Sequence, residues 1–140
     1  MSITEIATLV DSLPGVLTLR PTPGDGTPEL AWGDLFFYYA PDGVLPPGQP
    51  FATVIVKDYP DEPPSGLGAG VFRVNVDAGR RGQAPPQDPT LRDQVMPHPA
   101  YAALGWVCVV QPGPASAGQL EALVREAHAA ARRRWERRRE

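Results

Sequence analysis

The sequence predicts an α+β domain in which an antiparallel sheet of about five strands is flanked by an N-terminal and a C-terminal helix. Helical periodicity is confined to the two ends of the 140-residue chain, and short β-type runs fill its middle. The loops between those runs are rich in Pro and Gly and are too short for crossover helices. We expect a single domain over residues 1–131, followed by an arginine-rich helix end at 132–140.

The N-terminal segment carries the signals of a short amphipathic helix. Ser2 and Glu5 have the spacing of a capping box, and apolar side chains recur at helical spacing as far as Leu13. Pro14-Gly15 then ends the helix. A brief β-type run over 16–20 follows, and the Pro- and Gly-containing residues 21–28 predict a loop or hairpin turn.

Four further runs predict strands, at residues 32–40, 51–57, 71–76 and 106–110. In the third of these runs, apolar residues alternate with Arg73, Asn75 and Asp77. This alternation predicts a half-buried strand with Phe72, Val74 and Val76 on the core face and a solvated opposite face. The span 79–99 is interrupted by five prolines and is expected to be the least structured part of the chain.

The last element is predicted to be a helix that begins at about Ser116. Ser116 and Gln119 repeat the capping-box spacing, and an apolar stripe runs from Leu120 through Val124 and beyond. Ala, Arg and Glu are good helix formers, so we expect the helix to continue through the arginines, with Trp135 on the apolar stripe. His128 is expected to be solvated.

Charge is unevenly distributed along the chain. Residues 132–140 contain six Arg and two Glu, a net +4, so the other 131 residues carry −7 of the total charge of −3. The apolar runs are shorter than a membrane span requires, and the N-terminus lacks a signal-peptide pattern, so a cytoplasmic location is expected. Cys108, the single cysteine, excludes a disulfide framework and a multi-thiolate metal site, and no cofactor is expected.

Five segments spread over nearly the whole chain carry a family resemblance: residues 32–43, 50–53, 57–60, 72–75, and 98–99 with 104–109. Together they resemble an uncharacterised bacterial family, domain of unknown function 6194. More distantly, the layout is similar to the YjbR/MmcQ-like proteins, whose N-terminal helix ends in Leu-Pro-Gly, as residues 13–15 do here. That resemblance implies a curved antiparallel sheet and a C-terminal helix, and such proteins are often labelled DNA-binding by analogy. The chain departs from the pattern at residues 78–97, where Pro and Gly oppose the short helix of those relatives.

Two glycine-containing segments imitate nucleotide and nucleic-acid loops without their structural context. Residues 66–70 resemble a phosphate loop, but they precede a strand instead of opening a helix, so a strand connection is expected. Residues 79–82 resemble the backbone clamp of KH domains, which requires two flanking helices, so a plain turn is expected. Cys108 lies in an apolar run and is expected to be an inert buried thiol. No catalytic constellation is identified.

The polar residues near the predicted strand ends are the candidate ligand-binding residues. His98 lies between two prolines, which hold it rigidly; it is either a ligand contact or proton carrier, or a hydrogen-bonded structural histidine. Asp34, Asp58 and His98 would suit a metal, but nothing in their spacing requires them to converge, and no metal site is predicted. Tyr39 and Trp106 would line a pocket or pack in the core. The candidate binding residues are Tyr38, Lys57, Asp58, Arg73, Asn75 and His98.

The sequence therefore favours a non-catalytic binding module for a small ligand or partner protein. The alternative is a nucleic-acid-binding protein that uses the sheet edge and the six arginines of the C-terminal end, which are Arg132, Arg133, Arg134, Arg137, Arg138 and Arg139. Two other interpretations of the arginine-rich end remain. It is a solvated helix terminus, or it contacts a partner protein or the acidic remainder of its own chain. An enzyme built around Asp58 and His98 is a third possibility.

Overall fold

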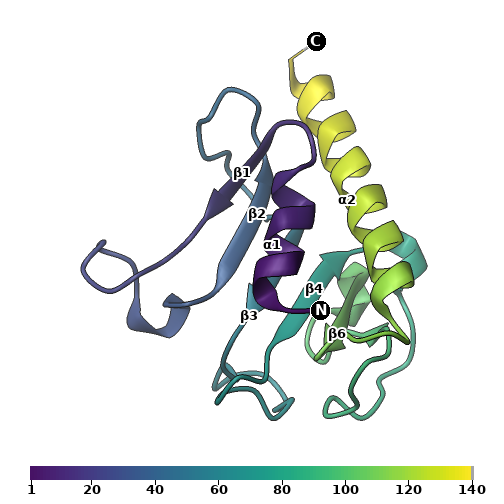
Figure 1. Cartoon of the computed structure of the whole chain (residues 1–140). Helices are drawn as coiled ribbons and strands as arrows, with labels where there is room; N and C mark the ends of the chain where they lie inside the picture. Colours follow the sequence, from purple (N-terminus) through teal and green to yellow (C-terminus); the bar gives the residue numbers. More distant parts are fainter. Residues whose placement is uncertain (140) are drawn as a thin grey trace.

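Six strands form one antiparallel sheet in the computed structural model, which describes residues 1–139 (Figure 1). The order across the sheet is β1-β2-β3-β4-β6-β5. The α+β class and the two terminal helices are confirmed. The sixth strand, which the sequence did not predict, is a two-residue edge strand inside the Pro-rich span. The elements are α1 (Ile3–Asp11), β1 (Val16–Leu19), β2 (Leu35–Tyr39), β3 (Ala52–Ile55), β4 (Arg73–Asp77), β5 (Met96–Pro97), β6 (Trp106–Val110) and α2 (Ala117–Arg138).

The start of α1 is the capping box that the sequence predicts. The Ser2 Oγ accepts a hydrogen bond from the Glu5 backbone N–H at 3.1 Å, and Glu5 Oε1 accepts one from the Ser2 N–H at 3.0 Å. These bonds satisfy N–H groups that have no partner inside the helix. The buried face of α1 contains Ile6 and Val10.

The start of α2 differs from the sequence prediction. Ser116 is the N-cap residue, but its side chain makes no capping bond, and no capping box forms with Gln119. Asp93 holds the turn before the helix instead: its carboxylate accepts hydrogen bonds from the N–H groups of Gly113, Ala115 and Ser116 and from the Ser116 hydroxyl. These bonds, the Ser116 hydroxyl above all, lower the pKa of Asp93 to about 2.

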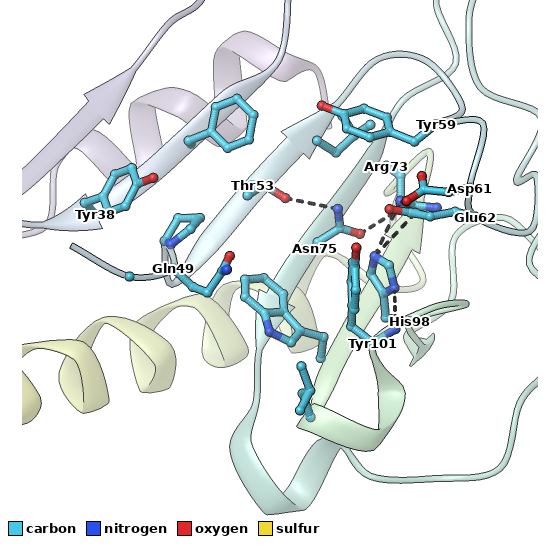
Figure 2. Close-up of a pocket in the computed structure, with 16 residues that line it drawn as sticks. Tyr38, Gln49, Thr53, Tyr59, Asp61, Glu62, Arg73, Asn75, His98 and Tyr101 are labelled. Carbon is cyan, nitrogen blue, oxygen red and sulfur yellow. Dashed lines mark hydrogen bonds and ion pairs between the residues drawn. The ribbon is translucent and has the colours of Figure 1, made fainter. Parts of the chain in front are cut away.

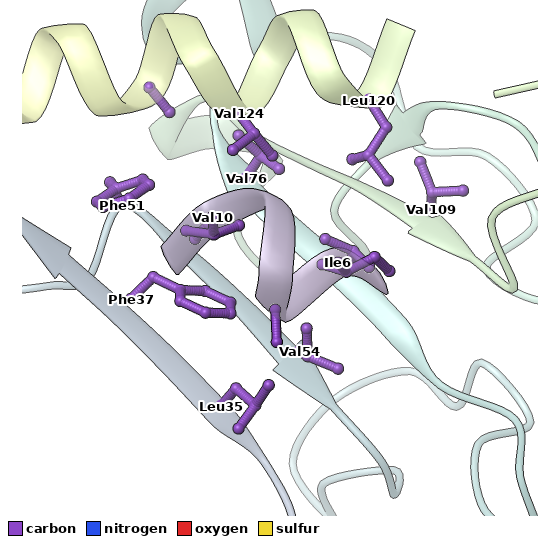
Figure 3. Close-up of a cluster of buried hydrophobic side chains, with 14 of the residues drawn as sticks. Ile6, Val10, Leu35, Phe37, Phe51, Val54, Val76, Val109, Leu120 and Val124 are labelled. Atoms are coloured by element: carbon purple, nitrogen blue, oxygen red, sulfur yellow. The ribbon is translucent and has the colours of Figure 1, made fainter. Parts of the chain in front are cut away.

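Both helices cover the same face of the sheet, and the main hydrophobic core lies between them and the strands (Figure 3). Ile6 and Val10 of α1, and Leu120 and Val124 of α2, are at most 1% exposed. They meet the inward side chains of four strands, which include Leu35, Phe37, Ala52, Val54, Val74, Val76, Val107 and Val109. The sequence predicts this core face of β4 correctly.

The far end of α2 packs against the sheet through aromatic side chains. Trp135 meets Tyr39 edge-on, with ring centroids 5.8 Å apart, and the Arg139 guanidinium lies 3.9 Å from the Trp135 ring centroid. The predicted continuation of the helix and the place of Trp135 on its apolar stripe are confirmed. His128 was expected to be solvated, which is wrong. Its side chain is buried, and its Nε2 donates to the Pro14 carbonyl at 2.6 Å.

Candidate functional site

The face of the sheet opposite the helices carries a cavity of about 500 Å³ (Figure 2). Because side chains alternate along a strand, the residues between the core positions of β2, β3 and β4 all point to this face. Loops that follow β2, β3 and β5 close the sides of the cavity. The strand residues that line it are Phe36, Tyr38, Thr53, Ile55, Arg73, Asn75 and Trp106, and the loop residues include Gln49, Tyr59, Asp61, Glu62, His98 and Tyr101.

The floor of the cavity is a buried polar network centred on Arg73. The Arg73 side chain is 3% exposed, and its Nη2 lies 2.9 Å from Glu62 Oε1, whose side chain is 9% exposed. Arg73 Nε donates to Asn75 Oδ1, and Nη1 donates to Ser65 Oγ, each at 2.9 Å. Each guanidinium nitrogen therefore has a partner, which a buried charge requires.

Asn75 extends this network across the sheet. Its Oδ1 accepts from Arg73, so its Nδ2 donates to Thr53 Oγ1 at 3.0 Å, directly opposite on β3. The network fixes the orientation of the amide, because reversing it would place an N–H group against the Arg73 N–H. The floor of the cavity is thus rigidly specified by hydrogen bonds.

His98 closes the network on the β5 side and is 3% exposed. Its Nδ1 accepts two hydrogen bonds, from the backbone N–H groups of Ala100 and Tyr101, both at 3.0 Å. Nδ1 therefore carries no proton, and the neutral ring is protonated at Nε2. Burial, with a smaller contribution from the nearby Arg73 charge, lowers the pKa of His98 to about 3. His98 is a neutral hydrogen-bond donor at physiological pH.

This protonation state predicts a pH-dependent stability. The pKa of His98 is about 3 in the folded protein and 6.5 in the unfolded chain. Between pH 3 and pH 6.5 the unfolded chain therefore binds more protons than the folded protein. The free energy of unfolding consequently decreases as the pH falls below 6.5. Between pH 7 and pH 5 the loss due to His98 is expected to be about 2 kcal/mol. In His98→Asn, the Asn Oδ1 replaces Nδ1 as the acceptor of the two N–H groups but does not titrate. Urea unfolding of both proteins at pH 7 and 5 measures the difference, and equal losses would contradict this protonation state.

Aromatic side chains form the walls of the cavity. Tyr38 and Phe36 come from β2, Trp106 from the start of β6, and Tyr101 from the turn that follows His98. The Tyr101 ring lies over the His98 ring, with centroids 4.8 Å apart and an angle of 33° between the planes. Partial burial raises the pKa of Tyr38, so its hydroxyl keeps its proton. The cavity combines flat apolar walls with a polar floor.

Four of the six candidate binding residues converge in this cavity: Tyr38, Arg73, Asn75 and His98. The prediction that Arg73 and Asn75 lie on a solvated face is wrong. They are 2% and 4% exposed, because the loop that contains Glu62 and the turn that contains His98 fold over the strand. The open face of β4 is polar but is not in bulk water.

Lys57 and Asp58 do not line the cavity and instead hold loops in place. Lys57 Nζ donates to the carbonyls of Leu30 and Trp32 at 2.7 and 2.8 Å. The Asp58 carboxylate accepts from the N–H groups of residues 65–67 at 2.8–3.1 Å. These bonds occupy the first amides of the glycine-containing loop, which therefore connects two strands instead of cradling a phosphate.

Asp34 and Tyr59 form a second, partly buried pair at the cavity. Asp34 is fully buried and accepts from the Tyr59 hydroxyl at 2.6 Å and from the Val56 N–H at 2.9 Å. Burial raises the pKa of Asp34, and burial together with this hydrogen bond raises the pKa of Tyr59. Within residues 1–139, no three His, Cys, Asp or Glu side chains are grouped as a metal site would require.

Sequence reasoning missed Thr53, Glu62 and Tyr101 as cavity residues. A signal existed for Thr53, because it is the polar residue between Ala52 and Val54 on a strand of period 2. The others lie in loops, and nothing in the local pattern indicates where those loops fold. Trp106 lines the cavity, whereas Tyr39 packs against α2.

Cys108 is buried, as the sequence predicts, and its low reactivity stays a prediction. It is 1% exposed, lies opposite Asn75 on the neighbouring strand, and is covered by Met96. Burial raises the pKa of the thiol from 9 to about 11. The raised pKa alone reduces the thiolate fraction at pH 7 by about 100-fold.

A thiol reagent should therefore label Cys108 at least about 100-fold more slowly in the native protein than in urea at the same pH. The release of the reagent's chromophore gives both rates. Native labelling as fast as that of the unfolded chain would contradict the burial of this thiol and would require Cys108 to be considered as a nucleophile with His98 as its base.

Two arginines of the C-terminal end, Arg132 and Arg139, form ion pairs with carboxylates. Arg132 pairs with Glu136 at 2.8 Å, one helical turn away, and Arg139 pairs with Asp42 at 3.3 Å. Arg133 and Arg134 line a shallow cleft that also contains Arg80 and Arg81 from the 3₁₀ turn Gly79–Gly82. This turn is the plain connection that the sequence predicts.

The fold and the cavity define the class of this chain as a small α+β domain with a preformed polar pocket on the open face of an antiparallel sheet. The chain belongs to a family of unknown function (DUF6194), whose family model matches residues 1–140. Comparisons with curated proteins and with solved structures found no match. Among the helices of residues 1–139, none has the length and apolar character needed to cross a membrane.

Proposed function

We propose that this protein is a non-catalytic binding module and that the cavity on the open sheet face holds its ligand. The observation that carries the proposal is the convergence of Tyr38, Arg73, Asn75 and His98, from two strands and a loop, on one cavity of about 500 Å³. Cavities of this size, with mostly aromatic walls and a few placed polar groups, are typical of small-molecule sites.

The rigidity of the floor supports binding. Arg73 and Asn75 are held by four hydrogen bonds within the protein, so neither side chain has to be ordered when a ligand arrives. Binding sites gain affinity when ordering is completed during folding, because less entropy is lost on association.

The protonation states of the titratable groups favour binding over catalysis. A general base should have a pKa near the working pH, whereas the pKa of His98 lies at about 3. The pKa of Cys108, at about 11, is equally far from that of an activated thiol. The Glu62 carboxylate is already engaged in an ion pair with Arg73 at 2.9 Å.

A screen with a chemically varied fragment library tests the proposal. Trp106 lines the cavity and Trp32 and Trp135 do not, so the three indole N–H signals in a proton–nitrogen NMR spectrum report binding and its location. Hits are expected to shift the Trp106 signal saturably and leave the other two in place.

Two variants make the screen specific. Tyr101→Ala, which removes a wall, should weaken the hits, whereas Leu91→Ala should not, because Leu91 is similarly exposed but lies outside the cavity. A screen without hits at Trp106, or hits that are equally affected by both variants, would refute the proposal.

Nucleic-acid binding by the C-terminal arginines is the second candidate function. It is favoured by the cleft in which Arg80 and Arg81 join Arg133 and Arg134. The acidic remainder of the chain, at −7, opposes it, since a polyanion is repelled over the screening length of ~8 Å.

Salt-dependent binding to duplex DNA separates the two functions. If four arginines (Arg133, Arg134, Arg137 and Arg138) contacted phosphates, log K against log salt would have a slope of about −3.6. Replacing these four by Gln keeps Trp135 in place and should remove the slope. We expect no binding tighter than about 1 μM near physiological salt; tighter binding that the variant loses would favour the second function.

A further inference from the structure

We infer that the cavity selects a flat, uncharged ligand that carries a carbonyl or equivalent acceptor, which the floor formed by Thr53, Asn75 and His98 would bind. This inference rests on the proposed function and specifies its ligand class. Three properties of the cavity carry it: the direction of its free hydrogen bonds, its charge, and the shape of its walls.

The floor offers mainly donors. The neutral His98 ring bears its proton on Nε2, and the nearest groups to that nitrogen are Arg73 Nη2 at 3.4 Å, itself a donor, and Glu62 Oε1 at 4.0 Å, beyond hydrogen-bond distance. Thr53 Oγ1 already accepts from Asn75, so its O–H is free to donate, and Asn75 Nδ2 has a second hydrogen. A ligand acceptor would satisfy these groups.

The same floor has no excess positive charge to attract an anion. Arg73 is neutralised by Glu62 at 2.9 Å, His98 is neutral, and Asp61 adds a negative charge on the exposed side of the cavity. A carboxylate or phosphate placed on the donors would lie close to Glu62 and would not gain a counter-charge. A neutral carbonyl oxygen uses the donors without this repulsion.

A cation fits no better than an anion. The Glu62 carboxylate is already engaged by Arg73, and an ammonium group would face the donors of Thr53, Asn75 and His98. Asp61 is solvated at the rim, where ion pairs contribute little.

The walls select a flat ligand. Tyr38, Trp106 and Tyr101 present aromatic side chains around the polar floor, and Figure 2 shows Tyr101 beside His98 and Tyr38 at the far end of the cavity. Aromatic faces bind rings by offset stacking and by apolar contact. The volume of about 500 Å³ accommodates a ligand of one or two rings.

Three probes of similar size, each with one benzene ring, test the ligand class: benzamide, benzoate and benzylamine, which are neutral, anionic and cationic at pH 7. Titration of the full chain with each probe is followed at the Trp106 indole N–H, with Trp32 and Trp135 as internal controls. Benzamide is expected to bind in the millimolar range, as is usual for so small a ligand, and at least about fivefold more tightly than the two charged probes.

His98→Asn identifies the donor. The Asn side chain retains an acceptor for the N–H groups of Ala100 and Tyr101, but it is too short to place its own N–H donor at the position of Nε2. We expect this variant to bind benzamide at least about threefold more weakly, while the weak binding of benzylamine is unchanged. His98→Gln, whose longer side chain brings its amide N–H closer to the position of Nε2, should recover part of the affinity.

The outcomes separate the inference from the proposed function. If benzoate or benzylamine binds as tightly as benzamide, or if His98→Asn has no effect on benzamide, the ligand class is wrong while the cavity remains a binding site. If library fragments shift Trp106 but benzamide does not, the ligand class is again wrong. If nothing shifts Trp106, the proposed function itself fails.

Discussion

Val74→Asp is expected to yield no folded protein. Val74 is 1% exposed at the centre of the sheet, with Val54 and Val109 directly opposite on the two neighbouring strands. An unpaired carboxylate at this position would cost several kcal/mol against a total stability of ~5–15 kcal/mol. Circular dichroism and the dispersion of the amide NMR spectrum measure the outcome.

The matched control for this substitution is Val44→Asp. Val44 is 65% exposed, so the same change is expected to alter the free energy of unfolding by no more than about 0.5 kcal/mol. A Val74→Asp protein that still unfolds cooperatively near the wild-type midpoint would contradict the placement of this side chain in the core.

Arg73→Ala is expected to lower the free energy of unfolding by about 3–5 kcal/mol. Arg73 lies on the face of β4 opposite the hydrophobic core, so this loss comes from its polar contacts and not from core packing. The substitution leaves the Glu62 carboxylate, 9% exposed, without its counter-charge and leaves Asn75 and Ser65 without a donor. Removing one partner of a buried ion pair typically costs this much. Urea denaturation followed by fluorescence gives the free energy.

Two further variants show whether burial of the pair is the cause. Arg81 also pairs with a glutamate, Glu126 at 3.6 Å, but both side chains are more than half exposed, so Arg81→Ala should change stability by less than about 0.5 kcal/mol. The double variant Arg73→Met with Glu62→Leu removes both charges and should recover much of the loss. Equal effects of Arg73→Ala and Arg81→Ala would contradict the buried network.

The helices and most strands could be predicted because their determinants are local. The capping box of Ser2 and Glu5, the Pro14-Gly15 stop and the alternation about Val74 act over a few residues. The β6 run of residues 106–110 has the predicted bounds. β5 was missed because two residues contain no periodicity, and Pro97 argued against a strand.

The errors at Arg73 and at the start of α2 arise from contacts between residues distant in the sequence. Arg73 has the pattern of a solvated residue, and its partner Glu62 lies 11 residues earlier in a Pro-rich loop. Ser116 and Gln119 match a capping box locally, but the Asp93 carboxylate, 23 residues before Ser116, accepts hydrogen bonds from both the N–H and the hydroxyl of Ser116. A capping-box spacing in the sequence therefore does not exclude that a charged side chain from elsewhere in the chain accepts these hydrogen bonds.

The candidate site shows the same limit. Residues on strands could be assigned to one face by alternation, which correctly groups Arg73 with Asn75. Lys57 and Asp58 were misplaced because they follow the end of β3, where alternation stops and both side chains turn to backbone groups. His98 was identified by its two flanking prolines, while its protonation state depends on the turn that follows it.

A crystal structure of the full chain soaked with benzamide tests the central claim, that the cavity on the open sheet face is a ligand site. We expect the benzamide ring between the aromatic walls, with its carbonyl oxygen about 3 Å from His98 Nε2 or Asn75 Nδ2. The Arg73–Glu62 pair beneath it should be unchanged. A cavity filled by its own side chains, with benzamide bound only elsewhere on the surface, would contradict the claim.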